Sequence, residues 1–237
     1  MPYRRLPNTD AARLRALRKA YELGKEIPPF KLAFSQSTLH ELNSFLPSFE
    51  KALFEYKQAY ANQVDRNKDY LPDLKKAKLY ISHYIQVLNM AIQRGEFPES
   101  ERSFYGIKEN ESRIPPLITE SDVIKWGEKL MHGEHLRALK SRTVITNPTI
   151  AVVKVRYEKF LDAYKFQKTL QKNLSRAQER IGTLRTVADE IIVKIWNEVE
   201  KKYQNLPENE KREKASVYGV VYVFRKNELK NMGNLSL

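Results

Sequence analysis

Apolar side chains recur at helical spacing along most of the chain, and glycine is scarce, with eight residues in 237. A three-and-four spacing places apolar positions on one face of an α-helix, whereas a strand would need alternation. One such stripe runs from residue 49 to residue 64, and a second runs from residue 77 to residue 91. Their members are Phe49, Leu53, Tyr56, Tyr60 and Val64, and then Ala77, Ile81, Tyr84, Leu88 and Ala91. The pattern predicts an all-α protein.

Capping residues and prolines divide this pattern into helices. The Thr9–Asp10 pair predicts a first helix over residues 10–23, with Gly24 as its stop. The capping box at residues 38–41 opens a second helix, which kinks or restarts at Pro47. Pro72 then breaks the stripe and begins a helix that ends at Gly95. A shorter helix is expected over residues 121–131, after another Thr-acidic pair.

The chain also matches itself at a nearly constant offset. Positions 43–63 match 147–167, residues 85–89 match 193–197, and each copy closes on a proline segment and a Tyr-Gly pair, Tyr105–Gly106 and Tyr218–Gly219. The order of these matches predicts an internal duplication, with a first helical repeat over residues 1–107, a linker over 108–118 and a second repeat over 119–237. The two repeats are expected to pack as one pseudo-twofold domain.

The second repeat allows two interpretations. Its apolar stripe continues from Ile150 to Ile195 without a proline, so periodicity alone permits a single helix of nearly sixty residues. The duplication favours a hairpin near residues 172–175, aligned with the predicted break at residues 69–72, and Ser175 to Gln178 has the form of a capping box. We therefore expect an antiparallel bundle of two long helical hairpins plus short helices.

The end of the second repeat changes character. Residues 217–224 are rich in β-branched and aromatic side chains, which predicts a short strand. Pairing with residues 105–107 would give a small two-stranded β element on the helical body.

Charge and cysteine content narrow the function. The formal net charge is +13, which favours an acidic protein partner, a phosphate backbone or an anionic lipid headgroup, although basic side chains also solvate helix faces without any partner. The chain has no cysteine, which excludes disulfides, a cysteine nucleophile and a thiolate zinc site. It has neither a secretory signal nor a membrane-length apolar run, so we expect a cytoplasmic protein without membrane insertion.

Two sets of residues are candidates for contact or specificity. The basic set would bind an acidic partner or a nucleic acid, and the amide set repeats beside the core stripes of both copies and would specify how the helices pair. The basic candidates are Arg4, Arg5, Arg13, Arg15, Arg18, Lys75, Lys76, Lys168 and Lys172, and the amides are Gln63, Gln167, Asn89 and Asn197.

The histidines give weak support for catalysis or metal binding. His132 and His135 lie three apart, but a di-iron bundle needs a second Glu-x-x-His copy, which is missing, so residues 128–135 indicate a solvated helix end. Neither His83 nor His135 has the context of a phosphotransfer histidine, and no phosphate loop or nucleophile elbow is present. We expect no cofactor, no metal and no catalytic residue.

The sequence favours a non-catalytic interaction or assembly protein whose basic faces dock an acidic partner. The alternatives are a nucleic-acid-binding accessory protein and, less favoured, an enzyme or carrier with a pocket inside the bundle.

Overall fold

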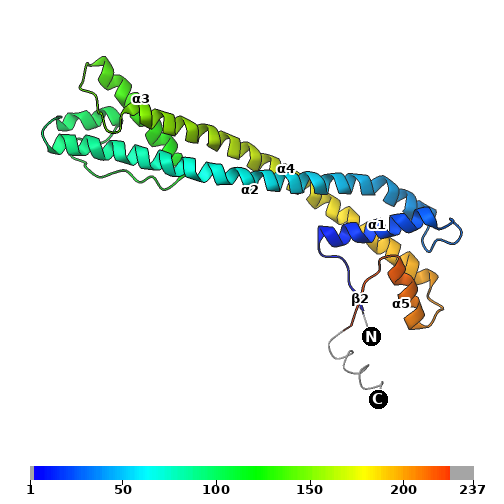
Figure 1. Ribbon diagram of the computed structural model, residues 1–237. Helices are drawn as coiled ribbons and strands as arrows, with labels where there is room; N and C mark the ends of the chain where they lie inside the picture. Colours follow the sequence, from blue (N-terminus) through cyan, green and yellow to red (C-terminus); the bar gives the residue numbers. More distant parts are fainter. Residues whose placement is uncertain (1–2, 225–237) are drawn as a thin grey trace. The chain divides into compact units, whose positions relative to one another are not determined.

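The computed structural model describes residues 3–224, of which about 74% are helical, so the all-α prediction is confirmed (Figure 1). Thr9 begins the first helix, where its hydroxyl accepts a hydrogen bond from the Ala12 N–H at 3.2 Å. The elements in chain order are β1 (Tyr3–Arg4), α1 (Asp10–Glu26), α2 (Gln36–Gln93), the 3₁₀ helix η1 (Glu99–Tyr105), α3 (Glu120–Leu139), α4 (Ile150–Lys202), α5 (Glu208–Val217) and β2 (Tyr222–Val223).

The predicted hairpin near residues 172–175 is wrong, because α4 is one helix from Ile150 to Lys202. The capping-box residues Ser175 and Gln178 lie on exposed turns inside this helix, while Leu174 and Ala177 are half-buried and Ile181 is fully buried. The apolar face therefore continues through the expected turn. Burying that face stabilises the continuous helix by more than a local capping box would stabilise a helix end at this position.

The predicted break at residues 69–72 is also wrong, since α2 continues through both Pro47 and Pro72. An interior proline removes one backbone hydrogen bond. Contacts of the residues around Pro72 compensate: Tyr70 is buried and donates its hydroxyl proton to Glu120, and Asp73 lies 3.3 Å from the Lys159 ammonium. Tertiary contacts thus keep the helix intact where propensity predicted an end.

The described residues form two compact units. Unit 1 comprises residues 3–59 and 174–224, and unit 2 comprises residues 60–173, so α2 and α4 each contribute to both. Within each unit, the segment of α2 and the segment of α4 run antiparallel. In unit 1 the pairs Glu41–Lys194 and Glu55–Arg180 set this direction, at 2.7 and 2.9 Å.

Each unit has its own apolar core. The core of unit 1 includes Leu17, Phe49, Ile195 and Trp196, and that of unit 2 includes Tyr84, Leu88, Leu130 and Phe160. All of these side chains are at most 1% exposed. The core of unit 1 holds α1 and α5 against α2 and α4, which positions the pocket described below.

The predicted two-stranded β element exists, but its partner strand is a different one. β1 pairs with β2 in antiparallel register, Tyr3 opposite Val223, whereas Val217 ends α5 and Tyr105 ends η1. The expected strand over residues 217–224 is confirmed only at Tyr222–Val223, and its pairing with residues 105–107 is wrong. Both Tyr-Gly pairs instead lie at the end of a helix, with Gly106 at φ 66° and Gly219 at φ 86°, a conformation that glycine adopts without strain.

The duplication stays a prediction. The order of elements is a short helix, a long helix and a short closing helix, given first by α1, α2 and η1 and then by α3, α4 and α5. The predicted linker over residues 108–118 lies between η1 and α3. The two compact units do not coincide with the two predicted repeats, because each unit takes helices from both.

Candidate anion-binding pocket

The start of α1 is held against α4 by two reciprocal ion pairs, which we call the α1–α4 clamp: Asp10 with Arg185 and Arg13 with Asp189. Each arginine donates two hydrogen bonds of 2.8 Å to its carboxylate. Bidentate pairs of this kind fix orientation as well as distance. The hydrogen bonds from Arg185 lower the pKa of Asp10, and those to Asp189 raise the pKa of Arg13.

Beside this clamp, unit 1 contains a pocket of about 460 Å³. A volume of this size is typical of sites for small ligands or short peptide segments. Its wall comes from the segment after β1, from one face of α1, from α4 and from the end of α5. The lining residues are Arg5, Leu6, Pro7, Asn8, Thr9, Ala12, Arg15, Ala16, Lys19, Trp196, Ser216, Gly219 and Val221.

The charge of this pocket has one sign. Arg5, Arg15 and Lys19 line it, and among the described residues none of their side chains has a hydrogen bond or an ion pair. The described part of the wall contains no carboxylate. Three cations that are unpaired within the described chain surround a concave surface, which makes this pocket a candidate anion-binding site, because their potentials add there and the low-dielectric wall weakens screening.

The other predicted basic contacts are placed differently. Arg4 donates to Asn197 and Glu200 and lies over the Trp196 ring, Arg13 belongs to the α1–α4 clamp, and Arg18 donates to Glu50 at 2.6 Å. In unit 2, Lys168 lies 3.6 Å from Glu120. Lys75, Lys76 and Lys172 are exposed and have no ion pair to a described residue. The structure therefore brings together Arg5 and Arg15, with Lys19, and none of the others.

The four repeated amides lie in four different environments. Asn89 is buried, donates to the Ser112 carbonyl and accepts from Arg102, each at 2.9 Å. Gln167 is buried and its Oε1 has no partner among the described residues, whereas Gln63 is half-buried and Asn197 is exposed. Only Asn89 has the satisfied, buried contacts of a residue that specifies helix packing.

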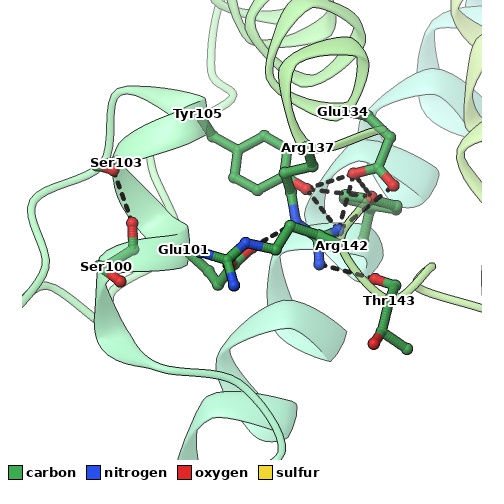
Figure 2. Close-up of polar contacts among 9 residues, drawn as sticks. Ser100, Glu101, Ser103, Tyr105, Glu134, Arg137, Arg142 and Thr143 are labelled. Atoms are coloured by element: carbon green, nitrogen blue, oxygen red, sulfur yellow. Dashed lines mark hydrogen bonds and ion pairs between the residues drawn. The ribbon is translucent and has the colours of Figure 1, made fainter. Parts of the chain in front are cut away.

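Unit 2 contains a buried polar network that the sequence analysis missed. Figure 2 shows Glu101 and Tyr105 of η1 facing Glu134 and Arg137 of α3. Arg137 donates to Glu101 at 2.6 Å, to Glu134 at 3.0 Å and to the Thr143 carbonyl at 2.9 Å. Tyr84 and Tyr105 also donate to Glu134, at 2.7 and 2.5 Å, and Arg142 forms an ion pair with Glu101 at 3.2 Å.

The network has the properties of a structural element. Burial raises the pKa of Tyr84 and Tyr105, so both hydroxyls remain proton donors. Burial opposes the charge on Arg137, but the hydrogen bond to Glu101 and the neighbouring groups outweigh it and raise its pKa. Every charged group in it is paired, since Arg137 contacts both carboxylates and Arg142 contacts Glu101. We assign it to holding η1 against α3.

Residues 128–135 belong to a continuous helix and are only partly solvated, which corrects the predicted helix end. Gly133 and Glu134 are buried, while His132 and His135 are exposed. A Cβ at Gly133 would lie 2.6 Å from the Phe104 carbonyl oxygen, so glycine permits the close approach of η1. Within residues 3–224, no three metal-ligating side chains come together.

Comparison with known proteins adds no assignment. No family model, curated protein or solved structure matches this chain. The pocket and the network are therefore interpreted from their own residues. None of the described helices has an apolar stretch long enough to span a bilayer.

The α1–α4 clamp predicts acid sensitivity of unit 1. Because hydrogen bonds from Arg185 lower the pKa of Asp10, its stabilising effect is complete above the ordinary pKa near 3.8 and is lost as the pH falls through the lower folded-state value. We expect Asp10→Asn to cost about 1–3 kcal/mol at neutral pH and to lose less stability than the wild type below about pH 4. Urea unfolding across this pH range measures both effects.

Asp65→Asn is the matched control, since Asp65 is exposed and, within residues 3–224, pairs only with Lys68 on the same helix. It should change the free energy of unfolding by less than about 0.5 kcal/mol. Equal losses for the two variants would contradict a stabilising clamp.

Proposed function

We propose that this chain is a non-catalytic interaction protein whose pocket in unit 1 docks an acidic segment of a partner protein. The observation that carries the proposal is the convergence of Arg5, Arg15 and Lys19 on a pocket whose described wall has no carboxylate. Charges so placed are matched to an anionic group that enters a concave site, and such complementarity gives specificity and fast association.

The polar groups of the pocket support binding rather than catalysis. Its hydroxyl side chains already form hydrogen bonds with backbone groups: Thr9 accepts from the Ala12 N–H, and Ser216 donates to the Glu213 carbonyl at 2.7 Å. The described wall contains no histidine and no acid that could act as a general base. The remaining groups are cations, amides and apolar surface, which can bind an anion but offer no proton acceptor.

Replacing Arg5, Arg15 and Lys19 together with glutamine is expected to weaken binding of a glutamate-rich peptide by at least about tenfold near 0.15 M salt, because three charge-assisted contacts are lost. Fluorescence anisotropy with a labelled peptide measures the affinity. All three side chains are exposed and unpaired within the described chain, so the fold should tolerate the change.

The matched control replaces Lys75, Lys76 and Lys172 with glutamine, which removes the same charge from exposed positions of unit 2 that have no ion pair to a described residue. It should change the affinity by no more than about twofold, since distant exposed charges are screened at this salt. An equal loss in both variants would show diffuse attraction and would contradict the pocket as the binding site.

The second candidate, a nucleic-acid-binding protein, is favoured by the net charge of +13 and by the exposed Lys75, Lys76 and Lys172. Phosphate contacts release counterions, so such binding falls log-linearly with salt. Submicromolar binding of mixed-sequence oligonucleotides near 0.15 M salt, lost in the Lys75/Lys76/Lys172 variant, would favour this candidate over the first.

A further inference from the structure

The pocket in unit 1 has an apolar floor as well as basic side chains. Leu6, Ala12, Ala16 and Val221 contribute to its wall, together with the buried Trp196. Leu6 and Val221 remain 46% and 50% exposed. A ligand that covers this apolar surface removes it from water, and this removal favours binding.

The apolar and basic groups alternate on a single face of α1. Residues 12, 15, 16 and 19 follow the spacing of one helix face, so the small side chains of Ala12 and Ala16 form one row beside the row of long side chains of Arg15 and Lys19. Arg5 comes from a different segment, the extended chain after β1. The hollow is therefore made by small residues, and cations from two elements border it.

Gly219 lies against α1 at the edge of the pocket. A Cβ at this position would lie 3.5 Å from the Ala16 Cα and from the Lys19 Cβ, and the backbone at φ 86° favours glycine.

Resting on the proposed function, we infer that the docked partner segment carries an apolar side chain flanked by carboxylates. The apolar side chain enters the hollow over Ala12 and Ala16, and the carboxylates pair with Arg5 on one side and with Arg15 and Lys19 on the other. A purely acidic segment leaves the hollow unfilled. Filling it with one leucine side chain improves affinity by about tenfold.

The test compares two capped glutamate-rich peptides of equal charge, one with a central leucine and one with a central glutamine, on the full chain. The leucine peptide should bind about tenfold more tightly to the wild type. Ala12→Leu fills the hollow and keeps the charges, so it should abolish the preference and leave the glutamine peptide unaffected. Arg15→Gln should weaken both peptides and leave the preference intact.

Leu6→Ser is the second variant, because it removes apolar wall without adding volume and does not depend on α1 accepting a larger residue. It should reduce the preference to less than about threefold. Equal affinity of the two peptides for the wild type would overturn the inference and leave the proposed function standing. Binding of neither peptide would overturn the proposed function itself.

An anionic lipid surface is the competing occupant, since exposed leucine and valine beside basic residues also suit a membrane interface. Sedimentation with vesicles of mixed anionic and neutral lipid tests it. Vesicle binding that is lost in both Leu6→Ser and Arg15→Gln, with no preference between the peptides, would overturn the inference in favour of a lipid.

Discussion

Replacing Arg137 with methionine is expected to lower the free energy of unfolding by about 3–5 kcal/mol. Arg137 is 1% exposed and its guanidinium bridges Glu101 on η1 and Glu134 on α3. Without it, Glu134 has no cation and keeps only the hydroxyls of Tyr84 and Tyr105. Glu101, which is itself 1% exposed, keeps only the partly exposed Arg142. Burying an unpaired charge costs far more than the pair contributes, so the loss should be large. Equilibrium urea unfolding followed by circular dichroism measures it.

Arg142→Gln is the control, because Arg142 binds the same Glu101 carboxylate at 3.2 Å but its side chain is 48% exposed. It should cost less than about 1 kcal/mol. Similar costs for the two variants would mean that water reaches Glu101, and the network would then not be the link between η1 and α3.

Part of the network could have been inferred from the sequence, because two charged residues occupy positions of the apolar stripe of α3. Glu134 and Arg137 continue the spacing of the buried residues Val123, Gly127 and Leu130 along one face of α3. Charged residues at stripe positions indicate a buried polar pair. Their partner Glu101 gave no such signal, since it lies among prolines and charges that resemble a linker, and only the tertiary contact identifies it.

The helical class was predictable because the stripes are long and regular, but helix ends were not. Pro72 and the Ser175 capping box are true local signals for ends, and packing of Tyr70, Asp73 and Ile181 overrides them. Local propensity amounts to a few kcal/mol at most, whereas one buried face contributes more. Periodicity was therefore the better guide.

The pocket was predictable only in part. The basic cluster near the N-terminus was evident from the sequence. Which of its arginines are already paired with a carboxylate depends on residues distant in sequence. These carboxylates are Asp189 for Arg13, Glu50 for Arg18 and Glu200 for Arg4. Ala12 and Ala16 on the same face as Arg15 and Lys19 were the available signal for a hollow between cations. The contributions of Trp196 and Gly219 required the tertiary structure.

Truncating Ile195 to alanine should lower the free energy of unfolding by about 2–5 kcal/mol, because the side chain is 1% exposed in the core of unit 1 and its removal leaves a cavity. The effect tests whether the stripe of α4 faces a packed core. Val187→Ala, on the same helix with 38% exposure, should change stability by less than about 1 kcal/mol, since the gain in helix propensity offsets the little packing lost. Chemical denaturation of both variants decides the point: a loss below about 0.5 kcal/mol for Ile195→Ala would mean that this face of α4 is solvated, and the core that positions Trp196 beneath the pocket would then not exist in solution.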